Sequence, residues 1–154
     1  MYVVREELRE LIESGVAVSV ATADASGRPH LNTAWGPRIA PNGVTASVFI
    51  DRARSGPTLD DLTTTKQIAM TIGDPVSYRS IQLKGTATGV VLQPDEGDRN
   101  WVRLHREAFM VSTALIGDPP ALSRNMWTED VVRVDFAVEQ AFDQTPGPDA
   151  GRPL

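Results

Sequence analysis

Residues 16–38 read VAVSVATADASGRPHLNTAWGPR, and this stretch decides the fold. Val16, Val18 and Val20 alternate with smaller side chains, as they do in a strand that buries one face. A polar turn follows at 24–28, and Pro29 opens the return at a first strand position, where proline is tolerated. The stretch therefore predicts a strand, a turn and a second strand.

The same alternation predicts four more strands after the first two. Pro41-Asn42-Gly43 is a hairpin signal, because Asn-Gly readily adopts the positive φ angles of a tight turn. Gly85 and Gly89 mark bends or bulges within a long strand, as a barrel requires. Closely spaced strands favour an antiparallel meander. The predicted strands are 16–23, 29–40, 44–51, 67–72, 78–92 and 131–142.

Helical periodicity appears in three segments. Residues 2–14 form an amphipathic pattern that Gly15 ends, and a short helix is expected after Ser55-Gly56-Pro57-Thr58. A longer helix begins at Pro94 and ends at Asp118-Pro119-Pro120. The fold class is mainly β with α: an antiparallel barrel of about six strands with capping helices. We expect one domain over residues 1–143 and an irregular tail over 144–154, rich in proline and glycine.

Composition excludes several classes of function. The 15 basic and 20 acidic residues give a formal net charge of −5, which argues against nucleic-acid binding. The absence of cysteine excludes disulfides, thiolate nucleophiles and Cys-zinc sites, and fits a reducing cytoplasm. No apolar run approaches the roughly 20 residues of a membrane span, so we expect a cytoplasmic protein with no membrane partner. His30 and His105 alone do not suggest a metal site, which for zinc takes three or four protein ligands.

The strand that ends in Ala-Thr, the D-x-x-G-R-P turn and the alternating second strand resemble the opening of the pyridoxamine 5'-phosphate oxidase-like split-barrel flavin-binding proteins. The order of the predicted elements over residues 5–142 also resembles that family. The resemblance implies a split β-barrel, a homodimer and FMN in each of two interfacial clefts. It also implies a flavin-dependent oxidoreductase that acts on a small-molecule substrate or electron acceptor.

The resemblance further implies where the cofactor lies. In that family the ring follows the second and third strands, and the phosphate is held by the loop and short helix after the third. Thr58 stands in the place of the usual phosphate-binding lysine, and Asn32 and Pro37 replace two cations of true pyridoxamine-phosphate oxidases. That specific activity is therefore not expected. The candidate cofactor-binding residues are Asn32, Thr33, Trp35, Ile50, Asp51, Arg52, Arg54, Ser55, Thr58, Ser80, Gln82 and Lys84.

Three functions remain open from the sequence. The first is an oxidoreductase that uses FMN or a deazaflavin, with no catalytic side chain assigned because the flavin performs the redox step. The second is a non-catalytic, stress-related binder of flavin, deazaflavin or haem, with His105 as the residue to test for haem. The third is a cofactor-free dimeric barrel that acts through protein contacts. The 144–154 tail is expected to close the cleft of the partner subunit or to lie untethered.

Overall fold

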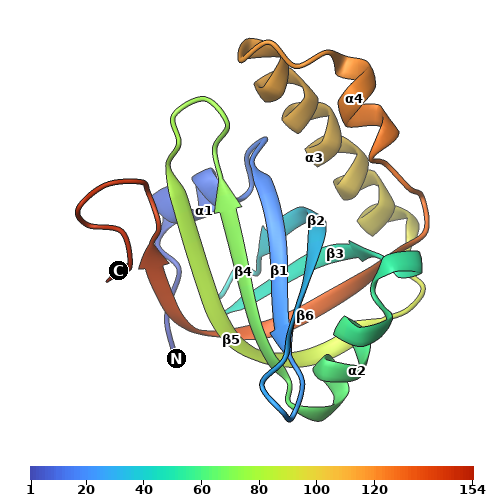
Figure 1. Cartoon of the computed structure of the whole chain (residues 1–154), viewed down its shortest axis with the longest axis vertical. Helices are drawn as coiled ribbons and strands as arrows, with labels where there is room; N and C mark the ends of the chain where they lie inside the picture. The colour runs from blue at the N-terminus through green and yellow to red at the C-terminus, as the bar shows by residue number, and fades with distance from the viewer.

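A six-stranded antiparallel barrel forms the centre of the molecule, as the sequence predicts. The computed structural model describes residues 1–154, and the sheet order is β3-β2-β1-β4-β5-β6-β7, with β3 also paired to β6 (Figure 1). This extra pairing closes β1 to β6 into a ring. The strands are β1 (Ala17–Ala23), β2 (Pro29–Ile39), β3 (Thr45–Asp51), β4 (Gln67–Gly73), β5 (Ser80–Val91), β6 (Val131–Asp143) and β7 (Arg152–Pro153).

The barrel interior holds the main hydrophobic core. Val20, Met70 and Phe136 are among the fully buried side chains that fill it. The helices are α1 (Glu6–Ile12), a 3₁₀ turn at Arg52–Arg54, α2 (Gly56–Thr64), α3 (Glu96–Leu115) and α4 (Pro120–Asn125). Helices α1 and α2 add apolar side chains to this core, whereas α3 and α4 form a helical pair beside the barrel (Figure 1). None of the helices combines the length and apolar character needed to cross a bilayer.

Two helical segments differ from the sequence-based expectation. Helix α1 is shorter than the predicted 2–14, because the backbone of Tyr2 and Val4 bonds to Val138 and Gly43 instead. Helix α4 was not predicted, because Asp118-Pro119-Pro120 indicates the end of a helix. Pro120 instead starts a new helix, where its missing N–H costs nothing.

Several polar contacts fix helix α3 to the barrel. The buried Asp98 carboxylate accepts hydrogen bonds from Arg38 on β2, at 2.9 Å, and from Arg133 on β6, at 2.7 Å. One turn further on, the Trp101 indole donates to the carbonyl of Gly36 at 3.0 Å. Gly36 has φ +55°, and a Cβ there would lie 3.0 Å from Trp101, so glycine permits this close approach.

The C-terminal tail returns to its own barrel and is not irregular throughout. The tail curls back to the end of β6 (Figure 1). There strand β7 pairs with β6, and the Leu154 N–H donates to the Ala141 carbonyl at 3.0 Å. Leu154 packs against the main core. Positive φ angles at Gly147 and Gly151 allow the reversal that the proline and glycine content alone does not specify.

A substitution at Gly85 tests the role of the bulge that bends β5. The β5–β6 register shifts between Lys84 and Gly85, and a Cβ on Gly85 would lie 1.8 Å from the Ala137 carbonyl oxygen. We predict that Gly85→Ala lowers the free energy of unfolding by roughly 1–3 kcal/mol or more, as overpacking does. Gly89→Ala in the same strand is the control, because its Cβ would meet only an Asp135 oxygen at 3.8 Å. Equal urea midpoints for the two variants would contradict this account.

Candidate functional site

A cleft of about 250 Å³ lies on the outer side of β2, close to where β3 ends. Five of the residues predicted to bind the cofactor come together in its wall: Asn32, Thr33, Trp35, Asp51 and Arg54. Leu31 and Met126 complete the lining and are both more than half exposed. Four polar or charged side chains and three apolar ones therefore line the cleft.

Trp35 is the fixed wall of this cleft. Its side chain is 3% exposed and packs in a small cluster with Phe49, Val102 and Val131. Phe109 of α3 meets the indole edge-on, with ring centroids 5.7 Å apart. Because aromatic packing of this kind holds the ring orientation, Trp35 presents a rigid surface to anything that occupies the cleft.

Arg54 is the cation that lines the cleft, and its N–H groups are available to bind an anion. The Arg54 side chain is 85% exposed, and its Nε lies 3.9 Å from an Asp51 oxygen. The other Asp51 oxygen accepts from the Ala53 N–H at 3.0 Å and caps the 3₁₀ turn. Arg52 is used elsewhere, because it pairs with Asp130 at 2.8 Å and also donates to the Leu92 carbonyl. Of these two arginines, Arg54 is the one placed to bind an anion.

Three predicted residues have no exposed surface. The Thr58 hydroxyl accepts a hydrogen bond from the Asn32 amide, and the Ser55 hydroxyl donates to the Arg52 carbonyl at 3.0 Å. The Ile50 side chain lies in the barrel core. Thr58 and Ser55 thus hold the start of α2 and the Asn32 amide in place, instead of presenting hydroxyls to the cleft. The first N–H of α2, on exposed Gly56, donates to no backbone carbonyl.

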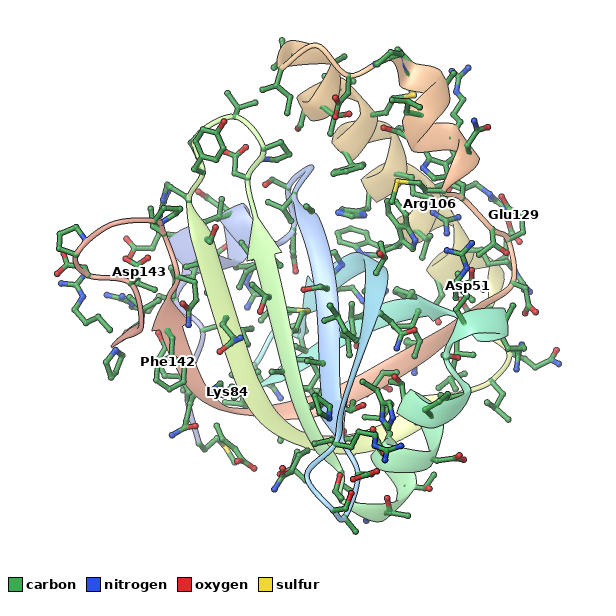
Figure 2. All side chains as sticks on the ribbon, viewed as in Figure 1. Asp51, Lys84, Arg106, Glu129, Phe142 and Asp143 are labelled. Carbon is green, nitrogen blue, oxygen red and sulfur yellow. The ribbon has the colours of Figure 1, made fainter.

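The predicted residues of β5 lie away from the cleft, with β1 and β4 in between. Gln82 donates to the Thr71 hydroxyl at 3.0 Å, and Ser80 donates to the Tyr78 carbonyl. The Lys84 ammonium lies 5.0 Å from the centre of the Phe142 ring (Figure 2). Lys84 lines a separate hollow of about 440 Å³ on the barrel surface. Within one chain, therefore, the structure does not bring Ser80, Gln82 and Lys84 to the cleft.

His105 holds α3 against the barrel. The Gly36 N–H donates to its Nδ1 at 3.0 Å, so Nε2 carries the proton and donates to the Val16 carbonyl at 3.0 Å. Burial lowers the pKa of His105 from an ordinary 6.5 to about 4, the nearby Arg106 charge adds to this, and the bond to Val16 partly opposes it. Because both ring nitrogens are engaged, His105 is not available as a haem ligand.

A second buried polar cluster was missed from the sequence. Asp61 of α2 is buried, and one of its oxygens lies 2.7 Å from His30 Nδ1 and accepts from the Thr22 hydroxyl at 2.6 Å. The signal was the spacing of Thr58 and Asp61, which places both on the inner face of α2. The cluster anchors α2 to β1 and β2 and leaves about a quarter of the His30 side chain exposed.

Comparison with known proteins agrees with this fold. The family model described as Pyridoxamine 5'-phosphate oxidase matches residues 4–141. HupZ of Group A Streptococcus is 19% identical with a TM-score of 0.56, over 96% of this chain and 99% of that chain. An F420 reductase is 18% identical with a TM-score of 0.56, over 90% and 98% of the two chains. An FMN-binding protein from Syntrophomonas wolfei is 11% identical with a TM-score of 0.51, over 89% and 86%. No curated protein matches the chain.

The buried neutral His105 predicts a pH-dependent stability. Above pH 6.5 the contribution of the neutral His105 to the free energy of unfolding is complete. Below that value the unfolded chain binds a proton that the folded chain does not take up until about pH 4, so stability falls with pH. Between pH 7.5 and pH 5 we expect a loss of about 2 kcal/mol from this group in urea unfolding.

His105→Gln separates this effect from the carboxylates. The pKa values of Asp24, Asp74 and Asp143 are lowered below 3.8, chiefly by side-chain hydrogen bonds, so these groups do not titrate between pH 7.5 and pH 5. The variant should be less stable at pH 7.5 but should lose most of the slope. The same slope in the variant and the parent would show that another group causes it.

Proposed function

Because the chain belongs to the pyridoxamine 5'-phosphate oxidase family, we propose that it is a homodimeric FMN-binding oxidoreductase that acts on a small molecule. The observation that supports this most is the cleft beside β2, which gathers Asn32, Thr33, Trp35, Asp51 and Arg54. Asn32 and Pro37 stand where true pyridoxamine-phosphate oxidases carry cations, so the substrate differs from theirs.

The residues of the cleft fit a flavin in two respects. Leu31 and Met126 offer exposed apolar surface to a planar ring and the largely buried Trp35 backs the cleft, while Asn32 and Thr33 add polar groups. Arg54 and the unpaired N–H of Gly56 offer donors to a phosphate at the start of α2, where the helix dipole also favours an anion. A bound flavin supplies the hydride and electron transfer, and these residues bind and orient it.

The charge of the cleft favours one alternative. Asp51 lies 3.9 Å from Arg54 and offsets part of the single available positive charge. A cofactor phosphate would thus be held less firmly here than by two cations. This favours a flavin- or deazaflavin-binding protein with little catalytic activity as the second candidate. Haem is less well supported, because His105 is engaged and only His30 retains an exposed edge.

The proposed homodimer accounts for the predicted cofactor-binding residues of β5, which lie away from the cleft within one chain. Two cross-strand rows run over the outer face from β2 to β5, with small side chains in the middle. A second copy packed on this outer face would bring its own β5 towards the cleft of the first. The rows are Leu31–Ala21–Ala69–Lys84 and Thr33–Ser19–Thr71–Gln82.

The flavin proposal is tested by titrating the purified protein with FMN and recording bands at ~375 and ~450 nm after desalting. We expect Arg54→Ala to weaken FMN binding by about 1.5–3 kcal/mol, the range for hydrogen bonds to a charged group. Arg28→Ala, in the exposed 24–28 turn, is the matched control and should leave the affinity unchanged. A protein that stays colourless with FMN refutes the proposal, and equal affinities for the two variants remove Arg54 from the site.

The dimer proposal is tested at Ala69, in the middle of the first row. Ala69→Arg places a long charged side chain on the outer face without disturbing the core, because Ala69 faces away from the barrel interior. We expect a monomer by analytical ultracentrifugation, weaker FMN binding and an unchanged circular dichroism spectrum. A dimer that survives this substitution would place the interface elsewhere.

A further inference from the structure

Arg106 of α3 is a buried cation without a charged partner. The residue is 1% exposed and is the largest fully buried side chain of the protein. Its Nη1 donates to the Thr128 carbonyl at 2.7 Å, but Nε and Nη2 have no hydrogen-bond partner. Buried charged groups are normally paired, because an unpaired one loses its hydration without compensation.

A third unpaired donor lies next to this guanidinium. Only four buried side-chain polar atoms in the chain lack a partner, and three of them are Arg106 Nε, Arg106 Nη2 and Trp127 Nε1. The guanidinium carbon lies 4.9 Å from the centre of the Trp35 ring and 5.9 Å from that of Trp127. All three atoms are donors, so only an acceptor can satisfy them.

The arrangement of the unpaired atoms specifies the kind of acceptor. Nε and Nη2 form one edge of the guanidinium, and the two parallel N–H bonds of such an edge match the two oxygens of a carboxylate. The indole rings of Trp35 and Trp127 both contact the guanidinium, so an acceptor bound at this edge would lie close to aromatic surface. Asp51 and Glu129 lie nearby, as Figure 2 shows, but neither forms a salt bridge with Arg106.

We propose that Arg106 and Trp127 form a carboxylate-binding subsite directly behind the cleft. Trp35 belongs to both, since it lines the cleft and packs on the guanidinium. Met126, which precedes Trp127, lines the cleft as well. Because the donor atoms have no exposed surface, neighbouring side chains must move for a carboxylate to reach them. That the carboxylate belongs to the substrate of a flavin reaction rests on the proposed function, whereas the subsite itself does not.

Formate is the probe that tests the subsite, because it is the smallest planar carboxylate. It is titrated into flavin-free protein while tryptophan fluorescence and the thermal midpoint are recorded, with chloride at equal ionic strength as the reference. We expect a saturable fluorescence change and a rise in midpoint with formate only, since Trp35 and Trp127 flank the site and a ligand stabilises the state that binds it. An equal, unsaturated response to both salts would show that water satisfies these donors and would overturn the proposal.

Three variants locate the binding. Arg106→Met keeps an apolar stem of similar length and should abolish the formate response, and Trp127→Phe should weaken formate binding several-fold through the loss of one donor. Arg99→Met, which removes a half-exposed arginine of the same helix, is the control and should respond like the parent. A formate response that persists in a normally folded Arg106→Met variant would show that formate binds at another site.

The outcome is distinguishable from that of the cofactor proposal. Formate binding that persists in a protein unable to bind FMN would support the subsite and refute the flavin function. FMN binding without any formate response would support the flavin function and refute the subsite. The thermal midpoint of Arg106→Met in chloride reports whether the variant is folded, and only a folded variant without a formate response counts as support.

Discussion

The pairing of β3 with β6 is the constraint on which the rest of the structure depends. It closes the barrel, and its last matched pair sets Asp51 beside Val131. One residue beyond that pair, the Arg52 N–H donates to the Asp130 carbonyl at 3.0 Å, and the two side chains form an ion pair. The end of β3, the start of α2 and the segment before β6 therefore meet at one corner of the barrel. The candidate cleft and the unpaired guanidinium both lie at this corner.

The position of the site also depends on how helix α3 docks on the barrel, which it does in part through polar groups. Asp98 joins β2 to β6 through two arginines, and His105 joins β2 to Val16, just before β1, through both ring nitrogens. Such contacts depend on direction and distance, so they fix the rotation of α3 about its axis more tightly than apolar packing does. This rotation is what turns Arg106 towards Trp35 and leaves Leu104 half exposed.

The sequence predicted those features that depend on local pattern. Strict alternation predicted six strands, and Gly85 marked a bulge because no other residue fits beside the Ala137 carbonyl. It could not predict the buried face of α3, which includes the polar side chains of His105 and Arg106 while the apolar Leu104 and Val111 are exposed. The partners of these polar side chains lie between 22 and 89 residues away, and no local pattern encodes such distances. The same reason explains why Thr58 was expected in the cleft although Asn32 engages its hydroxyl inside the fold.

Three charged side chains around the cleft determine which ligand groups it can bind. Arg54 lies exposed at one side, Arg106 lies buried behind Trp35, and Asp51 lies near both. Burial lowers the pKa of Arg106, while Glu129 and Asp51 oppose the change, so the guanidinium keeps its charge in an apolar setting. In the binding mode that we propose, a cofactor phosphate at Arg54 and a substrate carboxylate at Arg106 together satisfy both arginines, whereas the cofactor alone leaves the buried cation unpaired. Because an unpaired buried charge costs several kcal/mol, the proposed arrangement favours a substrate that carries a carboxylate.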